Sequence, residues 1–242
     1  MTPIWHLGND VVDLGHHGGS GKARDQRFLA RVCSVEEVQT IGSSRDSDTA
    51  LWIHWAAKEA IYKSASKALG TPPIFHHPLF HVAFLKEALG EFLEGSLSTT
   101  QPTLAGTGHY KDIRFSLSVE RSTSAVHAVS WIHEEGRGFP PYRSECQEMP
   151  TAVRGPASGL EEHFSATEWE CVTHQASGLT RIRAREALAE EGGIPEEGLE
   201  IRCGPGAPGR RIPSVWIDGV EAPVDLTLSH HGRFLAFAFL KT

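Results

Sequence analysis

Cysteine is scarce in this sequence, and its four copies lie far apart. Cys33, Cys146, Cys171 and Cys203 include no C-x-x-C pair, which weighs against a zinc ribbon. A chain of 242 residues can bury a core without disulfides, so a reducing cytoplasm is the expected environment. The histidine cluster at 76–81 contains no cysteine or carboxylate and is interrupted by proline, which argues against a metal site there.

Long apolar runs are also missing. No run approaches the ~18 residues of a membrane-spanning helix, and no charged-then-apolar segment opens the chain. We therefore expect a cytoplasmic protein without membrane spans. Positive charge is in deficit, because 23 lysines and arginines against 30 acidic residues give a formal net charge of −7. Nonspecific binding of nucleic acid needs a basic surface, so this balance argues against it.

The first 70 residues carry the clearest secondary-structure signals. Residues 4–12 form a short apolar stretch that is typical of a strand. Residues 23–42 are predicted to be helical in two pieces, the second capped by Ser34 with Glu37 three residues later. A long helix is predicted over 46–70, where a glycine followed by two prolines ends it.

The remaining chain alternates strand and helix patterns. Short strand-like runs cover 79–132, and within them 113–118 and 125–132 are predicted to pair as antiparallel strands. Residues 134–160 are rich in Gly, Pro, Glu and Ser, which predicts a linker. Beyond the linker, helices are expected at 166–176 and 179–191, and strands at 198–203, 213–217, 224–229 and 233–240.

Three short segments of the first half have counterparts in the second half, in the same order. The pairs are 33–38 with 164–169, 56–60 with 183–187, and 115–118 with 226–229. We therefore predict a duplication: a first half at 1–133, a linker at 134–160 and a degenerate second half at 161–242. The expected fold is α+β, with pseudo-two-fold symmetry and a small antiparallel sheet packed with helices in each half.

Three polar residues could carry chemistry, although each also has a purely structural interpretation. Glu59 and Lys63 project from one face of the long helix, with Trp55 a turn earlier. They could form an ordinary surface ion pair that contributes about 0.2–0.5 kcal/mol. Asp10, near the end of the first strand, could equally cap a turn. Spacing alone does not decide between these interpretations.

The combination of motifs is more specific than its parts. Residues 8–10 read G-N-D, and 55–63 read W-A-A-K-E-A-I-Y-K about 45 residues later. Together with R-F-x-x-R at 27–31 and the serine segments at 116–118 and 228–230, this order resembles the 4′-phosphopantetheinyl transferases. It is most similar to their holo-acyl-carrier-protein synthase branch.

This resemblance implies a magnesium ion held by Asp10, Glu59 and the diphosphate of coenzyme A. Mg²⁺ takes oxygen ligands and commonly combines one or two carboxylates with substrate phosphates and water, which agrees with these two residues. Some members of the family have a second acid two residues after the aspartate, where this chain has Val12, so a water is expected to replace it. Lys58 and Lys63 match family lysines that contact phosphate.

The family's S-L-S-H motif, which binds coenzyme A phosphates, is complete in only one half. The first copy has Val119 in place of the histidine, whereas the second keeps Ser229 and His230. Conversely, the second half lacks G-x-D, and its W-x-x-K-E copy has become I-R-A-R-E at 182–186. Because single-domain relatives build the site between subunits, we expect one complete site between the two halves of a monomer.

Several arginines are further candidates. Arg210 and Arg211 lie where the family often has a basic segment near the nucleotide, but an arginine pair is also common in solvated turns. Arg24, Arg27 and Arg31 share one helical face, which is either a docking strip for an acidic carrier protein or an ordinary solvated surface. The family position favours Arg27 for contact with coenzyme A or the carrier.

The activity implied by the resemblance is transfer of the 4′-phosphopantetheine arm from coenzyme A to a serine of an apo acyl or peptidyl carrier protein. Adenosine 3′,5′-bisphosphate would be released, with Glu59 as the candidate base and Lys63 beside the diphosphate. Two alternatives remain open at this point: a catalytically inactive protein that binds coenzyme A or a carrier, and a Mg²⁺-dependent coenzyme A diphosphate hydrolase. Whether the carrier serves fatty-acid, polyketide or peptide synthesis is also open.

Overall fold

The computed structural model describes residues 5–16, 18–95, 102–133, 138, 140–149, 157, 159–192, 196–204 and 212–241. Its helices are α1 (Gln26–Val32), α2 (Val35–Ser43), α3 (Ser47–Ala68), α4 (Lys86–Glu94), α5 (Ala166–Trp169) and α6 (Gln175–Gly192). Short 3-10 turns occur at Lys22–Arg24, His77–Leu79 and Glu161–His163.

Within the described residues, the strands pair antiparallel and form three sheets. The largest has the order β1-β5-β4-β3-β2, and the two smaller ones have the orders β10-β11-β6 and β7-β8-β9. The first-half strands are β1 (Gly8–Asp13), β2 (His81–Phe84), β3 (Thr103–Tyr110), β4 (Ile113–Arg121) and β5 (Ala125–Ile132). The others are β6 (Arg143–Glu148), β7 (Leu199–Cys203), β8 (Pro213–Ile217), β9 (Val220–Glu221), β10 (Val224–His231) and β11 (Phe234–Lys241).

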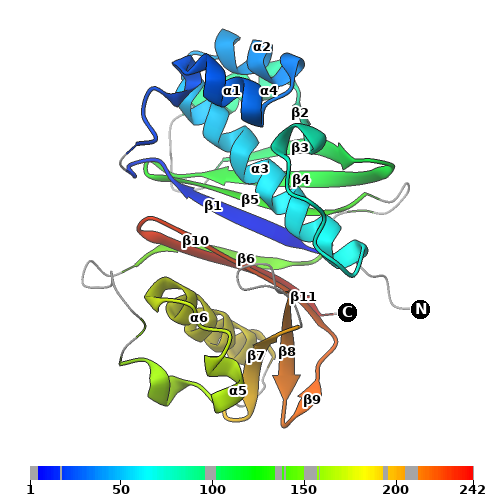
Figure 1. The fold of residues 1–242 in the computed structure, drawn as a ribbon, viewed down its shortest axis with the longest axis vertical. Coiled ribbons are helices and arrows are strands. Elements are labelled where there is room, and N and C mark those ends of the chain that lie inside the picture. Colours follow the sequence, from blue (N-terminus) through cyan, green and yellow to red (C-terminus); the bar gives the residue numbers. More distant parts are fainter. Residues whose placement is uncertain are drawn as a thin grey trace.

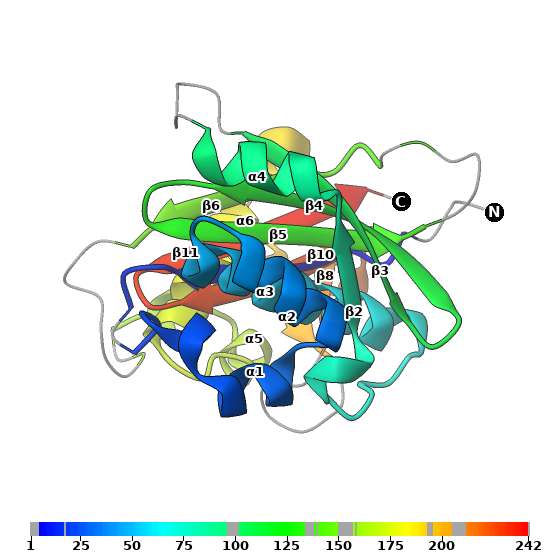
Figure 2. The same cartoon turned by 90° about the horizontal axis from the view of Figure 1, so that it is seen from above.

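Helices cover the outer faces of two sheets that pack against each other. The helix α3 lies on the five-stranded sheet, α6 lies on the sheet β10-β11-β6, and the two sheets face one another between them (Figure 1). Figure 2 shows α1, α2 and α4 around α3 on the same side of the five-stranded sheet. Apolar side chains fill the spaces between α3 and the five-stranded sheet, between the two sheets, and between α6 and the sheet β10-β11-β6. These two helices and two sheets therefore form four packed layers.

The sequence signals at the start of the chain correspond to real helix boundaries. Ser34 caps α2 and forms the expected capping box with Glu37, since each side chain accepts the other residue's backbone amide. Asp46 caps α3 through the amide of Thr49. The antiparallel pairing of β4 with β5 is confirmed, as is the mixed character of the fold with its antiparallel sheets and helices.

Three segments differ from the sequence prediction. The helix expected over 166–176 ends at Trp169, and α6 begins at Gln175. Residues 86–94, expected among strand-like runs, form the helix α4, because Leu89 and Phe92 bury one face of it against the core. Arg143–Glu148, inside the segment expected to be a linker, form the strand β6 and pair with β11. None of the helices in the described ranges combines the length and the apolar character needed to cross a membrane.

Side chains of β10 hold the free edge of β1. Backbone amides of alternate β1-side residues donate to alternate side chains of β10, always 218 residues further along the chain. The four bonds join Leu7 to Asp225 (2.6 Å), Asn9 to Thr227 (3.1 Å), Val11 to Ser229 (3.2 Å) and Asp13 to His231 (3.0 Å). The edge amides of one half are thus satisfied by the other half.

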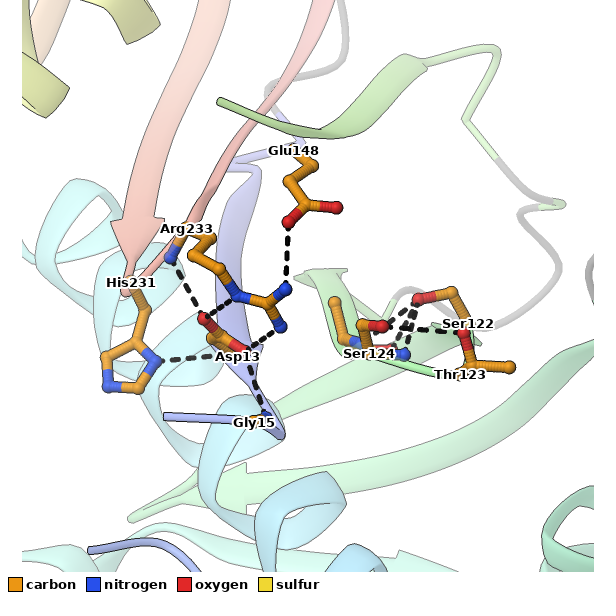
Figure 3. A network of polar contacts seen from close by, with 9 residues as sticks. Asp13, Gly15, Ser122, Thr123, Ser124, Glu148, His231 and Arg233 are labelled. Atoms are coloured by element: carbon orange, nitrogen blue, oxygen red, sulfur yellow. Dashed lines mark hydrogen bonds and ion pairs between the residues drawn. The ribbon is translucent and has the colours of Figure 1, made fainter. Parts of the chain in front are cut away.

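An ion-pair network joins β1 to the β10–β11 turn at one end of the contact between these strands (Figure 3). The buried carboxylate of Asp13 accepts from the guanidinium of Arg233 at 2.9 and 3.0 Å and from the amides of Arg233 and Gly15. Arg233 also pairs with Glu148 of β6 at 2.8 Å. Despite burial, these bonds lower the pKa of Asp13, so its charge ties β1 to the β10–β11 turn.

Candidate functional site

A cavity of about 410 Å³ lies between the two halves. One side is the C-terminal part of α3, which contributes Glu59, Lys63 and Lys67. The opposite side comes from the second half and includes Arg181 of α6 and His230 of β10. Residues 59 and 230, far apart in sequence, therefore line one space, as the predicted site between the halves requires.

Gly8 allows α3 to pass close to the strand that carries Asp10. A Cβ atom at position 8 would lie 2.0 Å from the carbonyl oxygen of Ala60 and 2.6 Å from the amide nitrogen of Ser64. These are backbone atoms of α3, so no side chain can move aside. The glycine of the G-x-D motif thus sets the distance between strand and helix, and through it the place of Asp10 beside Lys63.

Asp10 is the most perturbed carboxylate of the site. Its Oδ1 accepts from Ser229 Oγ at 2.7 Å and from Lys63 Nζ at 3.2 Å. Burial, together with the nearby charge of Glu59, raises the pKa of Asp10 to about 6 against the opposing effects of Lys63 and the Ser229 hydrogen bond. Two carboxylates are therefore close enough to repel each other in a poorly solvated place.

Lys63 links the two halves at this point. Besides Asp10, its ammonium donates to the carbonyl oxygen of Asn9 at 2.7 Å and to that of Leu228 at 3.2 Å. All three acceptors lie on β1 or β10, and the ammonium also borders the cavity. This anchoring holds a positive charge in a fixed place at the cavity wall.

His230 faces the cavity from the second half, with its ring 4.5 Å from that of His174. Burial, with smaller effects of His174, Lys63 and Arg181, lowers the pKa of His230 to about 4. The imidazole is therefore neutral at pH 7. An anion placed between these cations would reverse part of that effect and favour the protonated ring.

Two cationic residues at the cavity were not among the sequence candidates. Arg181 donates to Ser177 Oγ at 2.6 Å and to Cys203 Sγ at 3.1 Å, while its buried Nε has no hydrogen-bond partner in the described part of the chain. Lys67 pairs with Asp225 across the junction. Lys67 could have been found from helical spacing, because it follows Lys63 by one turn, and Arg181 directly precedes the I-R-A-R-E segment at 182–186.

Other sequence candidates lie elsewhere or outside the described residues. Lys58 points away from the cavity into the core, where it forms a 2.7 Å ion pair with Glu37. Arg27 is exposed on α1 and does not line the cavity. Arg210 and Arg211 lie outside the described residues.

The donor set suits a magnesium ion, although it is not a closed metal site. Among the described residues, no group of three or more His, Cys, Asp or Glu side chains is arranged to hold a metal. Asp10 and Glu59 nevertheless supply carboxylate oxygens, and of the two charged groups that act on Asp10, Glu59 is negative and Lys63 is positive. An excess of negative charge with few protein ligands is the usual setting for Mg²⁺ that completes its shell with phosphate and water.

Comparison with known proteins relates the chain to one family. Residues 6–128 match the family model described as the 4′-phosphopantetheinyl transferase superfamily. The chain is also similar to a holo-[acyl-carrier-protein] synthase of Hydrogenovibrio crunogenus, with 29% identity over 136 residues. That alignment covers 54% of this chain and 96% of the relative.

Proposed function

The chain belongs to the 4′-phosphopantetheinyl transferase superfamily, and on that premise we propose that it moves the 4′-phosphopantetheine arm of coenzyme A to a serine of an apo carrier protein. The observation that carries the proposal is the shared cavity. It joins Glu59 and Lys63 of the first half to His230 of the second, with Asp10 bonded to Lys63. Each half supplies groups that the other lacks.

In this reaction the serine oxygen forms a bond to the phosphorus that bears the pantetheine arm. The bond from that phosphorus to the bridging diphosphate oxygen breaks, and adenosine 3′,5′-bisphosphate leaves. Glu59 accepts the serine proton, directly or through a water. Asp10 and Glu59 would hold Mg²⁺, which when bound offsets charge on the diphosphate oxygens. Lys63 adds a second fixed positive charge at the same place.

The remaining groups divide between nucleotide and carrier. We assign His230 and Arg181 to the coenzyme A phosphates, because both face the cavity and phosphate is the ligand that guanidinium and imidazolium groups bind most strongly. Ser229 acts through Asp10, because its hydroxyl donates to the Asp10 carboxylate. Arg27, exposed on α1, remains available to an acidic carrier protein. Lys58 takes no part in this assignment.

We further propose that the second half is a diverged copy of the first. In the first half, buried Glu37 pairs with Lys58 and accepts from the amide of Val82 at the start of a strand. In the second half, buried Glu168 pairs with Arg185 at 3.0 Å and accepts from the amide of Ile201. Each glutamate follows a capping serine by three residues. The repeat of this arrangement supports pseudo-two-fold symmetry, with the halves at 1–133 and 161–242.

Mass spectrometry of apo carrier proteins tests the proposed transfer. Incubation with coenzyme A and Mg²⁺ should add one phosphopantetheine mass to an acyl or peptidyl carrier, and Glu59→Gln should abolish the gain while the protein stays folded. Loss of coenzyme A without a mass gain would identify a diphosphate hydrolase. Coenzyme A binding without either change would identify an inactive binding protein.

A pair of histidine variants tests whether the second half belongs to the site. His230→Ala removes an imidazole that faces the cavity and should raise the KM for coenzyme A about 10- to 100-fold, the equivalent of a charge-assisted hydrogen bond. His231→Ala is the matched control, because that ring accepts from Asp13 N instead. One coenzyme A per chain is expected in calorimetry. A larger effect of His231→Ala than of His230→Ala would show that the assignment is wrong.

A further inference from the structure

His77 is held rigidly behind the candidate base. Its ring lies between those of Trp55 and Phe75, with both centroid distances 4.2 Å. The backbone is fixed as well, because the carbonyl oxygen of His77 accepts from Lys58 Nζ at 3.1 Å. The side chain therefore has little freedom to rotate, and the direction of its nitrogen atoms is a property of the fold.

One ring nitrogen of His77 is directed at Glu59. The Nε2 atom lies 3.7 Å from Glu59 Oε1, beyond the 2.7–3.2 Å of a normal hydrogen bond by about half an ångström. Nε2 is buried, and within the described residues it has no hydrogen-bond partner. A buried polar atom without a partner destabilises the folded state, so its presence calls for a reason.

We propose that His77 is a positioning residue for Glu59, donating from Nε2 to Oε1 when the site is loaded. This inference rests on the proposed function, in which Glu59 holds Mg²⁺ and accepts the serine proton. The shift needed to close the bond is small, and hydrogen bonds of unloaded sites commonly shorten when ligands bind. One carboxylate oxygen is then fixed by His77, which leaves the other directed to the metal.

The need for such a partner follows from where Glu59 sits. Its carboxylate ends a flexible side chain on the cavity wall, and the side chain is 22% exposed. Lys63, one turn further along α3, is already bonded to Asp10 and to two backbone carbonyls. An outer partner that orients a metal-binding carboxylate typically contributes about 10- to 100-fold to metal affinity or activity.

The experiment compares His77→Phe, His77→Gln and the exposed control His76→Phe. Phenylalanine keeps the stacking with Trp55 and Phe75 but has no donor, whereas glutamine keeps a donor at nearly the same reach. Calorimetric titration of coenzyme A-loaded protein with Mg²⁺ should give about 10- to 100-fold weaker binding for His77→Phe. The loss should be smaller for His77→Gln and absent for His76→Phe.

A thermal melt separates positioning from folding. His77→Phe removes a buried unpartnered nitrogen and should melt at or above the wild-type temperature while kcat falls and the KM for coenzyme A stays unchanged. Equal Mg²⁺ affinity in His77→Phe and wild type would overturn the inference and leave the proposed function intact. Failure of wild type itself to bind Mg²⁺ with coenzyme A would overturn both.

Discussion

Replacement of Lys58 by methionine should destabilise the fold and leave the affinity for coenzyme A unchanged. Lys58 is 1% exposed and its partner Glu37 is 3% exposed, with 2.7 Å between Nζ and Oε2. Methionine has a similar length and no charge, so Lys58→Met leaves the Glu37 carboxylate buried without its cation. The motif alone would assign Lys58 to phosphate binding. The Lys58→Met variant distinguishes that role from a structural role in the buried ion pair.

The expected loss is about 3–5 kcal/mol, the cost of removing one partner from a buried ion pair. Glu37 keeps two other donors, the amides of Ser34 at 2.8 Å and Val82 at 3.0 Å, which favours the lower part of that range. For a chain of this size, 1 kcal/mol shifts the melting temperature by about 2–4 °C, so the shift should be roughly 6–20 °C.

Urea denaturation and coenzyme A titration should be run on the same variants. Lys86→Met, an exposed lysine on α4, is the matched control and should change stability by less than about 0.5 kcal/mol. The double variant Lys58→Met/Glu37→Gln should recover part of the loss, because no buried charge is left unpaired. Wild-type stability of Lys58→Met together with weak coenzyme A binding would refute the buried-pair interpretation and restore the phosphate role.

Two further predictions concern packing and pH. Gly8→Ala should cost about 1–3 kcal/mol or more in urea denaturation, since its Cβ would meet α3 backbone atoms, whereas Gly42→Ala, with open space around it, should be neutral or slightly stabilising. Burial lowers the pKa of His127 to about 3, below the 6.5 of the unfolded chain, so the unfolded state binds the extra proton as pH falls. The contribution of His127 to the unfolding free energy should therefore drop by about 2 kcal/mol from pH 7 to pH 5, and a His127→Gln variant that keeps the wild-type pH dependence would contradict this cause.

Local signals predicted most of the fold because they act within a few residues. The capping serine and glutamate of α2 and the capping aspartate of α3 bond to amides three residues away, so the sequence contains both partners. The missed helix α4 shows the limit of such signals. Gly90 disfavours a helix by about 1 kcal/mol, but Leu89 and Phe92 bury one face of it in the core, and that burial outweighs the local preference.

The strand β6 could not be predicted from its own residues. Its sequence R-S-E-C-Q-E has no alternation of apolar and polar side chains, and its side chains are mostly half-buried. It exists because β11, whose residues begin more than eighty positions later, offers a free edge to pair with. Pairing between distant segments leaves no local pattern to read.

The difference between Lys58 and Lys63 was accessible to sequence reasoning through helical geometry. Glu59, Lys63 and Lys67 follow each other at four-residue spacing and all line the cavity. Lys58 instead shares a stripe with Ile61 and Ala65, which are fully buried. A lysine within an apolar stripe needs a buried partner, and motif matching alone does not ask which face it lies on.

Joining both halves in one chain has a physical consequence for the site. The edge of β1 relies on β10 side chains for its amide partners, and the same strand β10 presents Ser229 to Asp10 and His230 to the cavity. Separating the halves would therefore remove the edge partners of β1 and the cavity wall together. Stability and part of the cavity wall therefore depend on the same strand pair. Under the proposed duplication, loss of the G-x-D and W-x-x-K-E residues from the second half would cost the fold little, because β10 would still supply the edge partners of β1 and part of the cavity wall.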